Sequence, residues 1–310
     1  MVDESGGQFE EHRGHLFGVA YRMLGSRSEA EDAVQETWLR YASSGSEPAD
    51  LRAWLTTVIG RICLDVLRSA RVRREAYVGQ WLPEPIVTRL PSGAPDPADE
   101  VAQHEQVSLA LLVVLERLTP EQRVAFVLHD VFAVPFESIA ATLDTTPAAA
   151  RQLATRARRT LAGPETPRHT ADLTEQRRVM SAFVAAAARG DLDGLVRILA
   201  PDVVVTGDGG GLAPASRQPV VGASQVSRFV LGLFRQADRF QVARAELALV
   251  NGDLGLVIDG VDPAGNPSLT VVALAVADGK ITAVYNQLNP NKLREVPRPD
   301  AATASWPPTV

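Results

Sequence analysis

The chain has almost none of the residues that build disulfide frameworks or metal clusters. Its 310 residues include one cysteine and five histidines. A single cysteine permits no internal disulfide, and the place of Cys63 in an apolar helical stretch favours a small buried side chain. The histidines never combine with Cys63 or with carboxylates at the spacing of metal ligands. The sequence therefore predicts no metal site, and nothing in it indicates a bound cofactor.

Long hydrophobic runs are also missing. The longest, 109–115 and 269–277, are far shorter than the roughly 18 apolar residues that cross a membrane. The N-terminus, 1–7, is acidic and carries no basic-then-apolar signal pattern, so neither export nor anchoring is indicated. We therefore expect no membrane contact and a cytoplasmic location. The length exceeds one typical core, and 45% hydrophobic residues suffice to fill several domains.

The chain has little positive charge overall but concentrates what it has. A net charge of −6 argues against a protein that binds DNA strongly by itself. Arginines nevertheless gather at 61–74 and 151–159, whereas acidic residues gather at 29–36. Such a chain can reach DNA at two basic patches while its acidic surface meets a protein partner that supplies the remaining affinity.

Two short helices around a tight turn are predicted at 134–161. Asp144 and Thr145 form the turn, and Thr146 caps a second helix that opens with Pro147. The second helix is two-sided, with an apolar face and a polar face that suits phosphates and base edges. The predicted DNA-binding side chains are Arg151, Gln152, Thr155, Arg156, Arg158 and Arg159. An ordinary surface helix with solvated arginines is the alternative.

Residues 9–76 have the periodicity of a helical domain. Ser28 and Glu31 predict a capping box for its second helix, and Asp50 predicts the start of its third. The third helix carries arginines that could hold phosphates and a tryptophan that could stack on an unpaired base. Its predicted DNA-binding residues are Arg52, Trp54, Arg61, Arg68, Arg71, Arg73 and Arg74. Packing in the core is the alternative for Trp54, and an ordinary solvated helix face is the alternative for Arg68, Arg71, Arg73 and Arg74.

Five prolines between 83 and 97 predict an extended linker, and the composition changes again after 163–164. Helices are then predicted at 173–189, 192–199 and 223–234, and strands at 202–206, 241–250, 255–261, 268–276 and 281–288. This order indicates a separate α+β domain. The proline-rich tail, 296–310, is predicted to be disordered.

The α+β domain offers few groups for acid–base catalysis. No histidine or cysteine follows His169, and the remaining candidates are Asp202, Asp208, Asp259, Asp262 and Tyr285. Asp208 lies in 207–211, where the glycines favour a turn with the aspartate capping local amides. We therefore predict no catalytic residue and favour a ligand pocket or a contact surface.

Several motifs in this order resemble a bacterial protein family. The segments 16–26, 31–40 and 51–68 resemble region two of extracytoplasmic-function RNA polymerase sigma factors, and 118–123 with the helix-turn-helix resembles region four. The linker motif Tyr77-Val-Gly-Gln-Trp-Leu-Pro-Glu-Pro85, with Asp208-Gly-Gly-Gly211 and Asn289-Pro-Asn-Lys-Leu293, resembles the subgroup that carries a C-terminal SnoaL-like domain. The resemblance implies a multidomain fold of two all-α sigma domains, the second with the helix-turn-helix, followed by an α+β SnoaL-like cone.

The resemblance also implies an organisation and partners. We expect a region-two domain at 1–80, a linker at 81–105, a region-four domain at 106–165 and the SnoaL-like domain at 170–295. Core RNA polymerase and promoter DNA are the implied partners, with region two reading the minus-ten element and region four the minus-35 element. The implied polymerase-binding residues are Glu31, Asp32, Gln35 and Glu36. A solvated helix start remains the alternative for this acidic segment.

Arg61 departs from the pattern, because many sigma factors of this class have asparagine at that place. An arginine presents a cationic fork where an amide would read adenine, so promoter sequence does not transfer from those relatives.

In this subgroup the extension is thought to regulate the sigma domains in cis. The residues expected to make regulatory contacts are Trp81, Pro83, Glu84, Asp208, Asn289 and Lys292. We expect Trp81 to act as an aromatic anchor and Glu84 as the charge partner of Lys292, one of only two lysines. A small-molecule ligand of the C-terminal domain is a further candidate partner. The competing hypothesis is a one-component DNA-binding regulator with a ligand-sensing or enzymatic C-terminal domain.

Overall fold

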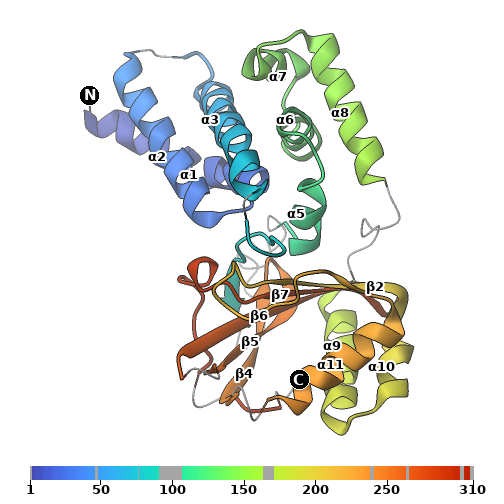
Figure 1. Ribbon diagram of the computed structural model, residues 1–310. Coiled ribbons are helices and arrows are strands. Elements are labelled where there is room, and N and C mark those ends of the chain that lie inside the picture. The colour runs from blue at the N-terminus through green and yellow to red at the C-terminus, as the bar shows by residue number, and fades with distance from the viewer. Residues whose placement is uncertain are drawn as a thin grey trace. The chain divides into compact units, whose positions relative to one another are not determined.

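The computed structural model describes residues 2–45, 48–75, 77–90, 107–162, 171–237, 241–262, 265–300 and 304–307. The chain divides into two compact units (Figure 1). The helical unit contains Met1–Ala76 and Leu112–Thr166, and the α+β unit contains Tyr77–Leu111 and Pro167–Val310. The described part of the predicted linker therefore belongs to the α+β unit.

The first half of the helical unit contains α1 (Val2–Leu24), α2 (Arg27–Ser44) and α3 (Leu51–Glu75). The cap of α2 is Ser26, whose hydroxyl accepts the Glu29 amide at 3.3 Å, so the predicted capping box at Ser28 is wrong. Gly25, with φ 67°, ends α1 directly before this cap. Helix α2 therefore begins closer to α1 than the sequence predicted. Asp50 caps α3, because its Oδ1 accepts the Ala53 amide at 2.9 Å.

The second half of the helical unit contains the helix-turn-helix. Its elements are α5 (Leu109–Leu115), α6 (Pro120–Phe126), the short π-helix η1 (Val127–Val131), α7 (Phe136–Leu143) and α8 (Pro147–Leu161). Thr119 and Gln122 form a reciprocal capping box at the start of α6. Asp144, with φ 50°, turns the chain between α7 and α8, and the Thr146 hydroxyl accepts the Ala149 amide at 3.2 Å. The predicted helix-turn-helix is confirmed.

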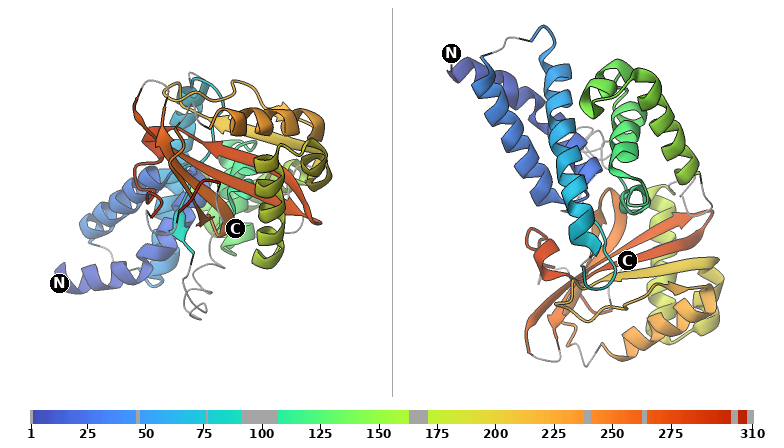
Figure 2. Two further views of the ribbon diagram at one scale, coloured as in Figure 1. Left: turned by 90° about the horizontal axis from the view of Figure 1, so that it is seen from below. Right: turned by 45° about the horizontal axis from the view of Figure 1, so that its top comes forward.

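The α+β unit is built on one seven-stranded sheet with the order β1-β4-β5-β6-β7-β2-β3 (Figures 1 and 2). The strands are β1 (Val87–Arg89), β2 (Leu199–Asp208), β3 (Val220–Val221), β4 (Arg244–Val250), β5 (Asp253–Val261), β6 (Pro267–Ala277) and β7 (Lys280–Gln287). Only the β2–β7 pair is parallel among the described pairings. Tight turns join β4 to β5 and β6 to β7, with positive φ at Asn251 and Gly252 and at Asp278 and Gly279.

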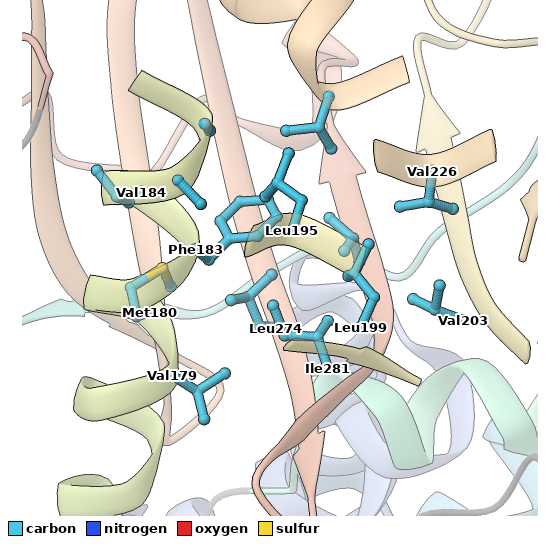
Figure 3. Packing of buried hydrophobic residues seen from close by; sticks show 14 of the residues in the cluster. Val179, Met180, Phe183, Val184, Leu195, Leu199, Val203, Val226, Leu274 and Ile281 are labelled. Atoms are coloured by element: carbon cyan, nitrogen blue, oxygen red, sulfur yellow. The ribbon is translucent and has the colours of Figure 1, made fainter. Parts of the chain in front are cut away.

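Three helices, α9 (Leu173–Arg189), α10 (Leu192–Ile198) and α11 (Ala223–Arg235), pack with the sheet around a hydrophobic core. Figure 3 shows Phe183 of α9 and Leu195 of α10 beside Leu274 and Ile281 of the sheet. Alternate strand residues face this core, since side chains of a strand point to opposite faces in turn. The predicted α+β class is confirmed.

Two segments outside the predicted α+β domain contribute to its sheet. Strand β1 comes from the predicted linker and pairs antiparallel with β4, with Val87 opposite Val250. In the tail, Ser305 forms a bridge with Ala245, and the Trp306 ring lies 5.2 Å from the Phe234 ring. The prediction of a disordered tail is therefore wrong for the residues that the structure describes there.

Candidate functional site

The buried carboxylate of Asp208 organises a polar cluster at the end of β2. This side chain is 0% exposed, and its oxygens accept hydrogen bonds from both the linker and its own domain. From the linker, the Tyr77 hydroxyl donates at 2.6 Å and the Leu82 amide at 2.9 Å. From the domain, the Gly210 amide donates at 3.0 Å and the Lys292 ammonium at 2.7 Å. These donors compensate the cost of burying the charge.

Lys292 lies in the short 3-10 helix η2 (Pro290–Lys292) and contacts the same linker segment. Its Nζ donates to the Leu82 carbonyl at 2.6 Å and lies 4.2 Å from the centre of the Trp81 ring. A cation over an indole face is attracted by the ring quadrupole. The observed ion pair of Lys292 is thus with Asp208, where the sequence had suggested Glu84.

Asn289 and Gln287 extend the cluster along the end of β7. The Asn289 amide donates to the Tyr77 hydroxyl at 2.8 Å, and the Gln287 amide donates to the Pro83 carbonyl at 3.2 Å. Burial, together with the hydrogen bond to Asp208, raises the pKa of the Tyr77 hydroxyl above its usual range. Tyr77 therefore remains a neutral donor, as the bond to a carboxylate requires.

The glycines after Asp208 let the chain pass close to this cluster. Gly210 has φ 60°, and a Cβ there would come within 2.2 Å of the Asn289 amide nitrogen. Any side chain at this place would therefore displace Asn289. The turn that the sequence suggested is present, and the Asp208 side chain caps the Gly210 amide. Tyr77 opens the linker motif found in the sequence but was not among the expected regulatory contacts, and no sequence feature indicated Gln287.

The polar face of α8 is exposed at most of its predicted DNA-binding residues. Arg151, Gln152, Arg156, Arg158 and Arg159 are exposed, and Thr155 is partly buried. The Arg158 guanidinium forms a bidentate pair with Asp130 at 2.6 and 3.2 Å, and Arg151 lies over the Phe136 ring. The helix thus offers an arginine-rich outer face and fixes some of its arginines by neighbours within the same unit.

The arginines of α3 contact other helices of the helical unit. Arg61 donates to the Ala141 carbonyl at 2.7 Å, and Arg68 pairs with Glu121 at 3.0 Å. Arg52 bonds the His15 ring at 3.1 Å. Trp54 is half-buried beside Tyr41, with ring centres 5.9 Å apart. The side chains of Arg71, Arg73 and Arg74 lie outside the described residues, and the DNA-binding role of this set stays a prediction.

The acidic residues of α2 form a mostly exposed face. Glu31 pairs with Arg27 at 3.0 Å and Glu36 with Arg40 at 2.9 Å, both along the helix, while Asp32 and Gln35 are exposed. Leu39, which is 60% exposed, is an apolar side chain on the same helix. An acidic face with an exposed leucine is suited to a protein partner.

The part of the chain that the structure describes shows neither a metal-binding cluster nor a membrane-spanning helix. No group of three or more His, Cys, Asp or Glu side chains there could hold a metal ion. Among the described helices, none combines the length and apolar character that crossing a bilayer requires.

Family models match three parts of the chain. A model described as Sigma-70 region 2 matches residues 8–73, one described as Sigma-70, region 4 matches residues 108–161, and one described as a SnoaL-like domain matches residues 180–284. They coincide with α1 to α3, with α5 to α8, and with most of the α+β unit.

Similar proteins align with this chain over most of its length. The chain is 47% identical over 300 residues to the ECF RNA polymerase sigma factor SigJ of Mycobacterium tuberculosis, covering 94% of this chain and 93% of that protein. It is 36% identical to the probable ECF RNA polymerase sigma factor SigI of the same species, over 91% and 92% of the two chains. The crystal structure of Mycobacterium tuberculosis SigJ matches with a TM-score of 0.74 and 45% identity, covering 94% of this chain and 99% of that chain.

Proposed function

Because this chain belongs to the extracytoplasmic-function RNA polymerase sigma factors, we propose that it binds core RNA polymerase, directs it to specific promoters, and is regulated in cis by its SnoaL-like domain. The observation that carries the proposal is the matched order of region two, region four and SnoaL-like domain. Its action belongs in the cytoplasm, where polymerase and DNA meet.

Two surfaces of the helical unit support the proposed binding to core polymerase and promoter DNA. The acidic face of α2, with Glu31, Asp32, Gln35 and Glu36, is the proposed contact for the polymerase. The exposed arginine face of α8 is the proposed reader of the upstream promoter element. The net charge of −6 limits binding to DNA by the sigma factor alone, so the polymerase must supply affinity.

The regulatory part of the proposal is supported by the linker contacts. The segment that joins the two sigma regions is held by Asp208, within the match to the SnoaL-like model, and by Lys292, which follows that match in the same α+β unit. Holding the linker fixes the length of free chain between the two DNA-reading regions, and this length determines which element spacing they can bind together.

We propose a non-enzymatic role for the SnoaL-like domain. Asp208, the candidate general base, is completely buried and already accepts bonds from Tyr77, Leu82 and Lys292. A base must have a free lone pair within reach of the substrate. Of the other candidates, Asp259 is paired with two arginines, and Tyr285 is buried.

Reconstitution with core polymerase tests the function directly. The full chain and core polymerase together should start transcription from a subset of promoter DNAs, whereas the chain alone should bind duplex DNA weakly. Arg156→Ala should weaken upstream-element recognition, by about 1–3 kcal/mol if its contact with a base is bidentate. Tight, sequence-specific binding by the isolated protein without transcription would instead support a one-component regulator.

Regulation is tested in the same assay with a matched pair of variants. Asp208→Asn removes the charge that holds the linker, and Asp202→Asn makes the same change at an exposed place on the same strand. We expect the first to change the transcription rate and the second to leave it unaltered. Equal rates for both variants and the unaltered protein would refute regulation through this contact.

A further inference from the structure

A cavity of about 810 Å³ lies inside the α+β unit, within the size range of small-molecule pockets. One side is formed by sheet residues, including Ile258 and Val272, and the other by Phe229 and Phe234 of α11. Trp306 from the tail lines it as well. Ile258 and Val272 are only partly buried although they lie mid-strand, since the cavity leaves one side of each uncovered.

The charges around the cavity are already occupied. Its ionisable lining residues, within the described chain, are Asp262, Arg294 and Arg298. Asp262 accepts the Asn266 amide at 2.8 Å, Arg294 donates to the Asn291 side chain at 2.7 Å, and Arg298 pairs with Asp259. Only these three side chains of the described lining are ionisable and each already has a hydrogen-bonding partner, so the lining offers little to compensate the lost hydration of a charged ligand.

Uncharged polar groups lie among the apolar ones. Thr270 and Asn286 lie on the sheet side of the cavity, on β6 and β7, and Val272 faces Asn286 across the ladder. Such groups can orient a ligand by one or two hydrogen bonds without requiring charge. The lining therefore fits a neutral, largely apolar molecule with a hydrogen-bonding group.

One wall of this cavity also holds the linker. Residues 212–216 line the cavity, and the carbonyl of Ser216 accepts a hydrogen bond from the Gln80 side chain at 2.8 Å. Gly211, next to this loop, packs so closely on Val78 that a Cβ would lie 3.1 Å from it. Gly207 lines the cavity, whereas its neighbour Asp208 binds the linker. A change in the conformation of this loop therefore alters both the wall of the cavity and the contacts with the linker.

We propose that this cavity binds a neutral, largely apolar small molecule, and that binding stabilises the observed conformation of the 209–216 loop and so strengthens its contacts with the 77–85 linker segment. The regulatory meaning of this coupling rests on the proposed function, but the binding and its effect on the linker do not. A ligand that binds only when the loop has this conformation stabilises every contact that the loop makes in it, by linkage.

Binding is tested with the full chain and Nile red, a neutral polycyclic dye whose emission shifts to the blue in apolar surroundings. We expect saturable binding that Val272→Trp, which fills the cavity, weakens at least about tenfold. Val221→Trp makes the same change on an exposed edge strand outside the cavity and should bind as the unaltered chain does. Thr270→Phe fills the same space from another position and is measured alongside, with thermal melting as the check on folding. Absent binding, or equal binding by all folded variants, would overturn the site.

Coupling is tested by hydrogen exchange at the linker. With dye at roughly ten times its Kd, exchange of the Leu82 amide, which donates to Asp208, should slow about tenfold. The folded cavity-filling variant should show no such change on adding dye. Dye binding without slower exchange would overturn the coupling. If Asp208→Asn left transcription unaltered, cis-regulation would be overturned. Slower exchange of the Leu82 amide on dye binding would still support the site and its coupling to the linker.

Discussion

The two units hold their parts together by different kinds of contact. In the helical unit, Arg68 and Glu121 pair across helices with 53% and 35% of their side chains exposed. In the α+β unit, the Asp208–Lys292 pair is 0% and 15% exposed. Exposed pairs contribute about 0.2–1 kcal/mol and are screened by salt, whereas breaking a buried pair costs about 3–5 kcal/mol. We therefore expect the helical unit to open more easily than the linker is released.

The helical unit also contains a buried charge, so the two units differ less than their ion pairs alone suggest. Arg123 of α6 is 3% exposed and donates to the Met23 carbonyl at 3.0 Å and to Glu116 at 2.6 Å. It joins the region-four helices to α1 through a buried cation. Apolar packing adds to it, since Gly60 of α3 lies against Thr142 and Leu128. The helical unit is thus closed by one buried arginine, close packing and several weak surface contacts.

The largest expected effect is at Asp208. Asp208→Ala leaves Lys292 and the Leu82 amide without their carboxylate, so the α+β unit should lose about 3–5 kcal/mol of unfolding free energy. Urea unfolding measures this loss, with Asp202→Ala as the control on the same strand. Equal losses of unfolding free energy for the two variants would mean that the buried Asp208 pair stabilises the α+β unit no more than an exposed side chain does.

Acid should loosen the helical unit through His15. Burial, followed by the charge of Arg52, lowers the pKa of His15 to about 4. Between pH 6.5 and 4 the unfolded chain binds the proton and the folded chain does not, so stability falls as pH falls through this window. The loss should be on the order of 1–2 kcal/mol, less than the full shift because solvent screens the partly exposed ring. Unfolding at pH 7 and pH 4.5 measures it.

His15→Gln should remove this dependence on pH and His12→Gln should retain it. If both variants kept the unaltered slope, another group would control the acid response of the helical unit.

Acid should have the opposite effect on the α+β unit through Asp253. Burial raises the pKa of this carboxyl to about 6, although the Gln176 hydrogen bond works against it. The folded chain therefore binds the proton more tightly, and stability is present below about pH 4 and lost as pH rises through 6. We expect the free energy of unfolding of the α+β unit to change by on the order of 1 kcal/mol, and denaturant unfolding measures this change. Asp253→Asn should flatten the curve, and a slope that survives it would exclude Asp253.

The smallest expected effect is at the Arg68–Glu121 pair. A double-mutant cycle should give a coupling of about 0.2–1 kcal/mol, which decreases at high salt because both side chains are partly exposed. The pair Arg27–Glu31, within α2, serves as the control for a contact that joins no separate helices. A coupling above roughly 3 kcal/mol would mean that the helical unit is closed as firmly as the linker is held.

Local signals in the sequence predicted the local structure well. The caps at Asp50 and Thr146 are where the sequence places them, because each depends on residues within one turn. The predicted helix at 173–189 has the observed bounds. The cap at Ser26 was missed because Ser28 also fits the pattern and only the end of α1 decides between them.

Long-range pairing could not be predicted in the same way. Strand β1 is three residues in a proline-rich segment, and its pairing with β4 leaves no periodic signal. The sequence singled out Trp81, Asp208 and Lys292, but it suggested Glu84 as the charge partner of Lys292 because Glu84 lies beside Trp81. The observed partner, Asp208, is 84 residues away, and only the β2–β7 pairing brings the two together.

The linker contacts also have a consequence for the order of events during synthesis. Lys292 binds the Leu82 carbonyl across 210 residues of chain. A ribosome that adds roughly 5–20 residues per second needs about 10–40 s to make that stretch. Both sigma regions leave the ribosome before the residue that completes the linker contact exists. Each newly made molecule therefore passes through a period in which its linker is not yet held, and the number of such molecules at any moment rises with the rate of production.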